Sequence, residues 1–130
     1  MKTLNQFMLE ASNDAIMSGL NHTSAERRLK AIRNASATPE HIHKALQDKD
    51  VDVRIAAAGH PNANEKNLKH AAKDKNSFVR QTAHLNHNST HDTLKHGLKD
   101  KDQFVRAAAE GSKDYLDKGK KIPHYYGGGI

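Results

Sequence analysis

Cysteine and tryptophan are both absent from this chain of 130 residues, and aromatic residues make up only 5% of it. Without cysteine there is no disulfide, no thiolate metal site and no cysteine nucleophile. No run approaches the ~18 apolar residues that a membrane helix needs, so we expect no membrane partner. Hydrophobic residues account for 35%. A core that small has to be built from closely packed small side chains.

Motifs of catalysis are also lacking. The chain has no glycine-rich phosphate loop and no G-x-S-x-G nucleophile turn, and its acidic residues recur at regular intervals as helix caps and ion pairs do. Basic residues outnumber acidic ones by 21 to 15, which gives a formal net charge of +6. This excess favours polyanions or acidic protein surfaces as partners. We therefore expect a binding protein that is not an enzyme and needs no cofactor.

The sequence repeats itself every 26 residues. VDVRIAAAGHPNANEKNLKHAAKDKN (51–76) aligns without a gap with SFVRQTAHLNHNSTHDTLKHGLKDKD (77–102), and ten of the 26 columns are identical. Further copies occupy 25–50 and, truncated, 103–112. A period of this length is typical of helical repeats, whose units bury their apolar faces by stacking on their neighbours.

Each full unit is predicted to be a short helix, a turn and a second helix. In the 51–76 copy, Asp50 is suited to cap the first helix, Gly59 to end it and Asn64 to cap the second. The positions expected to face inward are mostly small: Val53, Ala57, Leu68, Ala71 and Ala72, with Val79, Ala83, Leu94, Gly97 and Leu98 in the next copy. The fold class is therefore all-α, with helices that pack closely.

The flanking segments differ from the repeats, which we assign to 23–112. Residues 1–22 read as an amphipathic helix, with Leu4, Phe7, Met8, Ala11, Ala15 and Ile16 along one face. In 113–130 we expect a short helix at 114–118 and then a glycine-rich tail that is mobile unless a partner holds it. Tyr125 and Tyr126 in this tail are either an anchor that docks on a partner or incidental residues of a disordered end.

The unit pattern resembles leucine-rich-repeat-variant and HEAT-like helical repeats. The resemblance rests on the Val-Arg pairs at 53/54, 79/80 and 105/106, on the alanine run 56–58 and on Pro61-Asn62. It implies a short right-handed α-solenoid of 26-residue helix-turn-helix repeats over 25–112. The first copy departs from the pattern, with Arg27 where valine is expected. The resemblance implies little about function, because such solenoids are scaffolds.

A second resemblance covers residues 1–11. MKTLNQFMLEA is similar to the capsid-targeting leader of the internal head proteins of T-even-type bacteriophages. It implies that residues 1–10 direct the chain into the prohead and that the maturation protease cuts between Glu10 and Ala11. Met8 departs from the branched aliphatic residue that this protease prefers two positions before the glutamate. The competing interpretation is that residues 1–22 form a structural cap on the repeats.

The phage resemblance also suggests where the protein acts and on what. It implies the virion interior or the host cytoplasm, with DNA bound without sequence preference, or an acidic host or phage protein, as the partner. The alternative is a protein-interaction scaffold that never meets nucleic acid. The oligomeric state is left open.

Lysines recur in rows that would lie along one side of such a fold. We expect them to bind a polyanion or another partner, with ordinary solvated surface as the alternative. The candidate residues are Lys49, Lys69, Lys73, Lys75, Lys95, Lys99 and Lys101. The rows lack interleaved aromatic residues, which argues against stacking of single-stranded bases on the repeats.

Arginines and aspartates recur as well. Asp48, Asp74 and Asp100 each precede an arginine by six residues, namely Arg54, Arg80 and Arg106. We expect ion pairs that tie the second helix of one unit to the first helix of the next, in preference to a phosphate-binding role for the arginines.

The ten histidines form no convincing metal set. His84, His87 and His91 are spaced by three and four residues, but they span a predicted turn and no cysteine completes a tetrahedral site. We therefore expect no metal.

Overall fold

The computed structural model describes residues 1–124, and this part of the chain is all-helical, as the sequence predicts. The helices are α1 (Leu4–Leu20), α2 (Ala25–Ile32), α3 (Pro39–Ala45), α4 (Val51–Ala58), α5 (Glu65–Ala71), α6 (Ser77–Leu85), α7 (His91–Gly97) and α8 (Gln103–Asp117). None of them is both long and apolar enough to span a bilayer. Tyr125 and Tyr126 lie outside the described residues.

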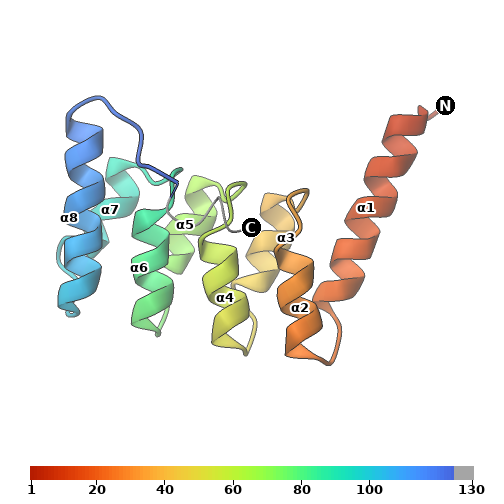
Figure 1. Cartoon of the computed structure of the whole chain (residues 1–130), viewed down its shortest axis with the longest axis horizontal. Helices are drawn as coiled ribbons and strands as arrows, with labels where there is room; N and C mark the ends of the chain where they lie inside the picture. The colour runs from red at the N-terminus through yellow and green to blue at the C-terminus, as the bar shows by residue number, and fades with distance from the viewer. Residues whose placement is uncertain (125–130) are drawn as a thin grey trace.

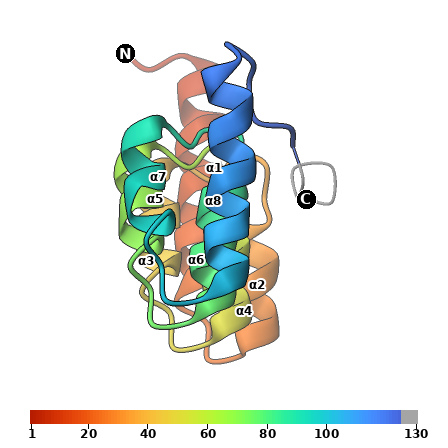
Figure 2. The ribbon, with the colours of Figure 1, turned by 90° about the vertical axis from the view of Figure 1, so that its left-hand side faces the viewer.

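The helices form two rows (Figure 1). In one row α2, α4, α6 and α8 each pack on the next, and in the other α1, α3, α5 and α7 do the same. Figure 2 shows the two rows face to face. The fully buried side chains between them are Ile32, Ile42, Val53, Leu68, Val79, Leu94 and Val105. The core is therefore a continuous strip along the molecule.

The contacts repeat at the same 26-residue interval as the sequence, and they extend the register backwards into α1. Ile16 and Leu20 are buried at positions equivalent to Ile42 and Leu46. His41 contacts the carbonyl of Asn13 at 3.2 Å, just as Asn67 donates to the carbonyl of Pro39 at 3.2 Å. The C-terminal half of α1 therefore occupies the place of a second helix, which the alignment starting at residue 25 did not reveal.

The first half of α1 packs on nothing. All of residues 1–11 are exposed, including Leu4, Phe7 and Met8, so the expected inward face of this helix is wrong before Ile16. Thr3 starts the helix through a capping box with Gln6. Periodicity predicted the helix correctly, but α2 and α3 reach only its C-terminal half (Figure 1).

Buried ion pairs join the two rows within each unit. They are Arg28–Asp48, Arg54–Asp74 and Arg80–Asp100, with Nε–Oδ2 distances of 2.8, 3.0 and 2.8 Å. The expected pairing of each aspartate with the arginine six residues later is therefore wrong. The backbone N–H of Asp50 donates to the Asp48 carboxylate at 2.8 Å, and this carboxylate faces the arginine of its own unit.

The arginine does link neighbouring units, but through backbone. Nη1 of Arg54 donates to the carbonyl oxygen of Asp48 at 2.9 Å, and Arg80 does the same to Asp74. Within residues 1–124, Arg106 keeps only this contact, to the carbonyl of Asp100 at 2.6 Å. The position equivalent to the paired aspartates is 126, which is a tyrosine and lies outside the described residues.

Asparagine side chains hydrogen-bond to the neighbouring turn, at the turns that connect the first and second helices of the units. Nδ2 of Asn62 donates to the carbonyls of Ala35 and Ala37, both at 2.9 Å. Asn88 repeats this one unit later, with Pro61 and Ala63 as acceptors at 2.7 and 2.9 Å. Each turn is thereby fixed to the preceding one.

The C-terminal segment also departs from expectation. The short helix predicted at 114–118 is the end of α8, and Gly119 stops it with a φ of 70°. The chain then returns over the turn between α6 and α7 (Figure 1). Ile122 is fully buried, its carbonyl oxygen lies 2.5 Å from Nδ1 of His87, and His124 stacks on His87. Residues 120–124 are therefore held, where a mobile tail was expected.

Arg54 pairs with a carboxylate whereas Arg106 bonds to a carbonyl, and this difference should show in the stability of variants. We expect Arg54→Ala to lower the free energy of unfolding by about 3 kcal/mol, because it leaves the carboxylate of Asp74 buried without its cation. Arg106→Ala removes only a bond to a carbonyl and should cost about 1 kcal/mol. Urea unfolding followed by circular dichroism measures both, and equal losses would contradict the structural role of the carboxylate pair.

Candidate functional site

Five exposed lysines gather along one edge of the molecule. This basic edge consists of Lys49, Lys73, Lys75, Lys99 and Lys101. They lie in the loops 46–50, 72–76 and 98–102, which run from one row of helices to the other at the N-terminal ends of α4, α6 and α8 (Figure 1). Asp50, Asn76 and Asp102 fix these loops, because each accepts hydrogen bonds from two backbone N–H groups of the following helix.

The charges of the basic edge are not neutralised by ion pairs. Within residues 1–124, none of the five lysines lies in a salt bridge. One aspartate in each of these loops pairs with an arginine. Burial raises the pKa of Asp100, but hydrogen bonds from Arg80 and the Asp102 N–H outweigh it, so the pKa stays below its usual value. The carboxylate remains ionised and bound to Arg80.

A shallow hollow lies within this edge. It has a volume of about 440 Å³ and is lined by Lys73, Lys75 and Lys101 together with the Arg80–Asp100 pair and Asp74. Lysines from two consecutive loops therefore face the same space, which is the arrangement that one anionic ligand needs in order to contact both.

The two other predicted lysines behave differently. Lys69 on α5 pairs with Glu65 at 3.8 Å and with Asp92 of α7, and Lys95 pairs with Asp92 at 3.2 Å. The hydrogen bond to Asp92 raises the pKa of Lys69, and the same bond lowers the pKa of Asp92. Lys69 and Lys95 thus belong to a neutralised surface network, separate from the basic edge.

Two phenylalanines lie beside the basic edge, and sequence reasoning missed them. Phe78 and Phe104 are 65% and 63% exposed and follow Lys75 and Lys101 by three residues. The expectation that aromatic residues are absent from the lysine rows is therefore wrong here. One signal was available in the alignment: the column that contains these two residues reads Glu26, Asp52, Phe78, Phe104.

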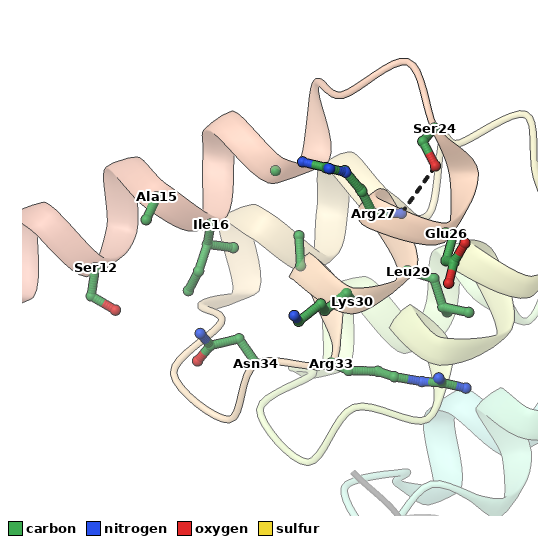
Figure 3. A pocket seen from close by; sticks show the side chains of 12 residues that line it. Ser12, Ala15, Ile16, Ser24, Glu26, Arg27, Leu29, Lys30, Arg33 and Asn34 are labelled. Carbon is green, nitrogen blue, oxygen red and sulfur yellow. Dashed lines mark hydrogen bonds between the residues drawn. The ribbon is translucent and has the colours of Figure 1, made fainter.

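A second basic surface borders α1. An open groove of about 920 Å³ separates α1 from α2 (Figure 3). Ala15, Ile16 and Leu29 supply apolar lining. The basic residues that line it are Arg27, Lys30 and Arg33, with Glu26 as the acidic one.

The predicted processing site lies in the exposed half of α1. Both Glu10 and Ala11 are exposed, and Glu10 pairs with Lys2 at 2.8 Å. The helix is continuous through the Glu10–Ala11 bond. Because no other helix packs against this half, the bond can be presented to a protease by fraying of one helix end.

Histidines have structural contacts instead of metal-ligand geometry. Nowhere in the described part of the chain do three His, Asp or Glu side chains converge as metal ligands. Nε2 of His60 donates to the carbonyl of Asn34 at 2.9 Å, and its Nδ1 accepts from the N–H of Asn62. Desolvation lowers the pKa of His60, against the effect of the bond to Asn34.

His84 is the exception, since it is fully buried and neither ring nitrogen has a hydrogen-bond partner among residues 1–124. Desolvation lowers its pKa to about 4, while the nearby charge of Asp100 opposes and those of His96 and Arg80 assist the shift. The ring occupies space left by Gly97: a Cβ there would lie 2.5 Å from Nε2 of His84. The preceding unit has Ala58 and Ala71 at these two positions.

Comparison with known proteins found no matching family model, no similar curated protein and no similar solved structure.

The His84–Gly97 pair predicts a specific pH dependence of stability. His84 has a folded-state pKa of about 4 against 6.5 when unfolded. Neutral histidine therefore stabilises the fold fully above pH 6.5, and this contribution, about 3 kcal/mol, is lost as the pH falls towards 4. We expect His84→Ala combined with Gly97→Ala, which copies the preceding unit, to reduce the slope of unfolding free energy between pH 6.5 and 4.5.

Urea unfolding at several pH values measures that slope. Gly97→Ala alone is the control: it overpacks the site against His84 and should destabilise by about 1–3 kcal/mol at pH 7. An unchanged slope in the double variant would show that another group carries the acid sensitivity.

Proposed function

We propose that this protein is a non-enzymatic binding protein that contacts a polyanion, with DNA as the first candidate, through its basic edge. One observation carries the proposal: Lys49, Lys73, Lys75, Lys99 and Lys101 are exposed on one edge, and none has an ion-pair partner within residues 1–124. Lysine ammonium groups attract phosphates by charge and read no bases, so the binding would be indifferent to sequence and weakened by salt.

The scaffold we propose is a short right-handed α-solenoid of 26-residue repeats. Its support is the recurrence of the Arg–Asp pairs, the turn asparagines and the buried Ile/Leu column at that interval. Neighbouring helices of a row pack about 8–10 Å apart. One or two exposed lysines in each of three successive loops give several weak contacts along an extended anion, whose energies combine.

The place we propose is the interior of a phage head, or the host cytoplasm after delivery, with residues 1–10 as a removable leader. This proposal draws support from the exposure of all of residues 1–11, because their loss uncovers no core residue. Removing Lys2 and Glu10 also leaves the formal side-chain charge at +6 (+1 and −1 cancel). The processed chain would keep its attraction for packaged DNA.

The groove between α1 and α2 favours a second candidate, a scaffold that binds a protein. Its apolar lining of Ala15, Ile16 and Leu29, next to three basic residues, suits an acidic amphipathic segment. The Tyr125–Tyr126 anchor predicted for such a scaffold falls outside the described residues.

Lysine substitutions distinguish the two functions. We expect Lys75→Ala/Lys101→Ala to weaken binding to a fluorescent DNA duplex by about tenfold and to lower the slope of log K against log salt by about 2, since two phosphate contacts are lost. Fluorescence anisotropy titrations at several salt concentrations measure both quantities.

Lys69→Ala/Lys95→Ala is a matched control with the same change in net charge. These two lysines are already neutralised by Asp92, so binding should fall by less than about twofold. If both double variants lose affinity equally, net charge and not the basic edge governs binding. If the wild type binds neither a duplex nor a single strand at low salt, the polyanion function fails and the protein-binding scaffold takes its place.

The leader hypothesis makes a separate prediction. Protein recovered from its native particle should have the mass of residues 11–130, and Glu10→Gln should give the full-length mass, because the protease recognises the glutamate. A recombinant chain of residues 11–130 should keep the melting temperature of the full chain to within about 2 °C, since residues 1–10 bury nothing. Full-length protein in mature particles would make the first helix a structural element.

A further inference from the structure

We propose that the aromatic part of the basic edge, formed by Phe78, Phe104, Lys75 and Lys101, binds single-stranded nucleic acid by stacking bases on the two phenyl rings. This deepens the proposed function, on which it rests, by naming the form of polyanion that this surface takes. The four side chains are exposed. The phenylalanines lie in the first turns of α6 and α8, which pack directly on each other, and the lysines lie in the loops that precede these helices.

Exposure of both rings is not required by the fold. The next residues, Val79 and Val105, are fully buried, and they supply the apolar contacts of these helix starts. At the equivalent positions of α2 and α4 the chain has Glu26 and Asp52. Since charged residues serve the scaffold equally well there, the phenylalanines at 78 and 104 need an explanation outside the core.

Charge changes together with the aromatic residues. The first turns of α2 and α4 contain Glu26 and Asp52, whereas the first turns of α6 and α8 contain no acidic residue. Lys49 lies three residues before an aspartate, but Lys75 and Lys101 each lie three residues before a phenylalanine. The C-terminal half of the edge therefore combines apolar rings with lysines that have no ion-pair partner within residues 1–124, and the aspartate next to Lys101, Asp102, caps α8.

This combination fits a single strand better than a duplex. Each nucleotide of a single strand offers a flat base and a phosphate, so one Lys–Phe pair can engage both. In a duplex the base faces are covered by stacking, and the rings would find only sugar and phosphate. The two rings also come from neighbouring helices, since α6 packs on α8. The axes of packed helices are about 8–10 Å apart, a spacing that an extended strand can follow from one helix to the next.

Phe78→Ala/Phe104→Ala tests the proposal in the full chain. The probe is a fluorescent oligothymidine of about 20 nucleotides, compared with a duplex of the same length. We expect the variant to bind the single strand about 5- to 100-fold more weakly, and the duplex to within about twofold of the wild type. Phe7→Ala, which removes an equally exposed ring on α1, is the matched control and should leave both affinities unchanged.

Both substituted rings are exposed, so the variant should keep the wild-type melting temperature. Unchanged single-strand affinity in Phe78→Ala/Phe104→Ala, with binding still lost in Lys75→Ala/Lys101→Ala, would overturn this inference and retain the proposed function. Failure of the wild type to bind either nucleic acid would overturn both. Binding to polyglutamate alone, lost in the phenylalanine variant, would assign the surface to an acidic protein and also overturn the inference.

Discussion

A buried arginine that contacts two units at once is the interaction on which the structure depends. Arg54 ties its own unit together through Asp74 and holds the carbonyl of Asp48 in the preceding one. A planar guanidinium with five donors can satisfy a carboxylate and a carbonyl simultaneously, which a lysine ammonium cannot do in one fixed geometry. The same arrangement has a consequence for the surface. One aspartate of each loop pairs with a buried arginine, and Asp50 and Asp102 cap helices. The lysines beside them therefore form no ion pair within residues 1–124, and the structural ion pairs contribute in this way to the basic edge.

The core places a second constraint on the chain: the two rows of helices pack closely, and this requires small side chains between them. Ala57, Ala58 and Ala83 are buried where α4 and α6 meet their neighbours, and the asparagines at 62 and 88 hold the turns at the distance that this packing sets. All three phenylalanines are exposed, which is unusual for residues of this size and makes their positions informative.

Local signals allowed much of the fold to be predicted from the sequence. The caps at Thr38, Asp50, Asn64 and Thr90 fix where helices begin, and the 26-residue alignment identifies buried columns such as Leu68 and Leu94. What could not be predicted depends on contacts between distant residues. Spacing along the chain suggested Asp48 with Arg54, but side-chain direction selects Arg28, twenty residues earlier. Likewise, the periodicity predicts an apolar face for α1 but does not indicate that its first half is uncovered. The composition of the tail does not predict that Ile122 is buried.

Departures from the repeat are the most direct guide to function in such a chain. The arginine and aspartate columns are explained by the scaffold, since Arg28, Arg54 and Arg80 each pair with the aspartate twenty residues later. Where the residues at an aligned position differ between units although the backbone is the same, the scaffold does not explain the difference. His84 with Gly97 is one departure, and it is resolved by packing, because the ring fills the space that the glycine leaves. Phe78 and Phe104 are a second departure. Both rings are exposed, they follow by three residues lysines that have no ion-pair partner within residues 1–124, and they lie on two helices that pack on each other. These observations support the proposal that the rings contact a bound molecule.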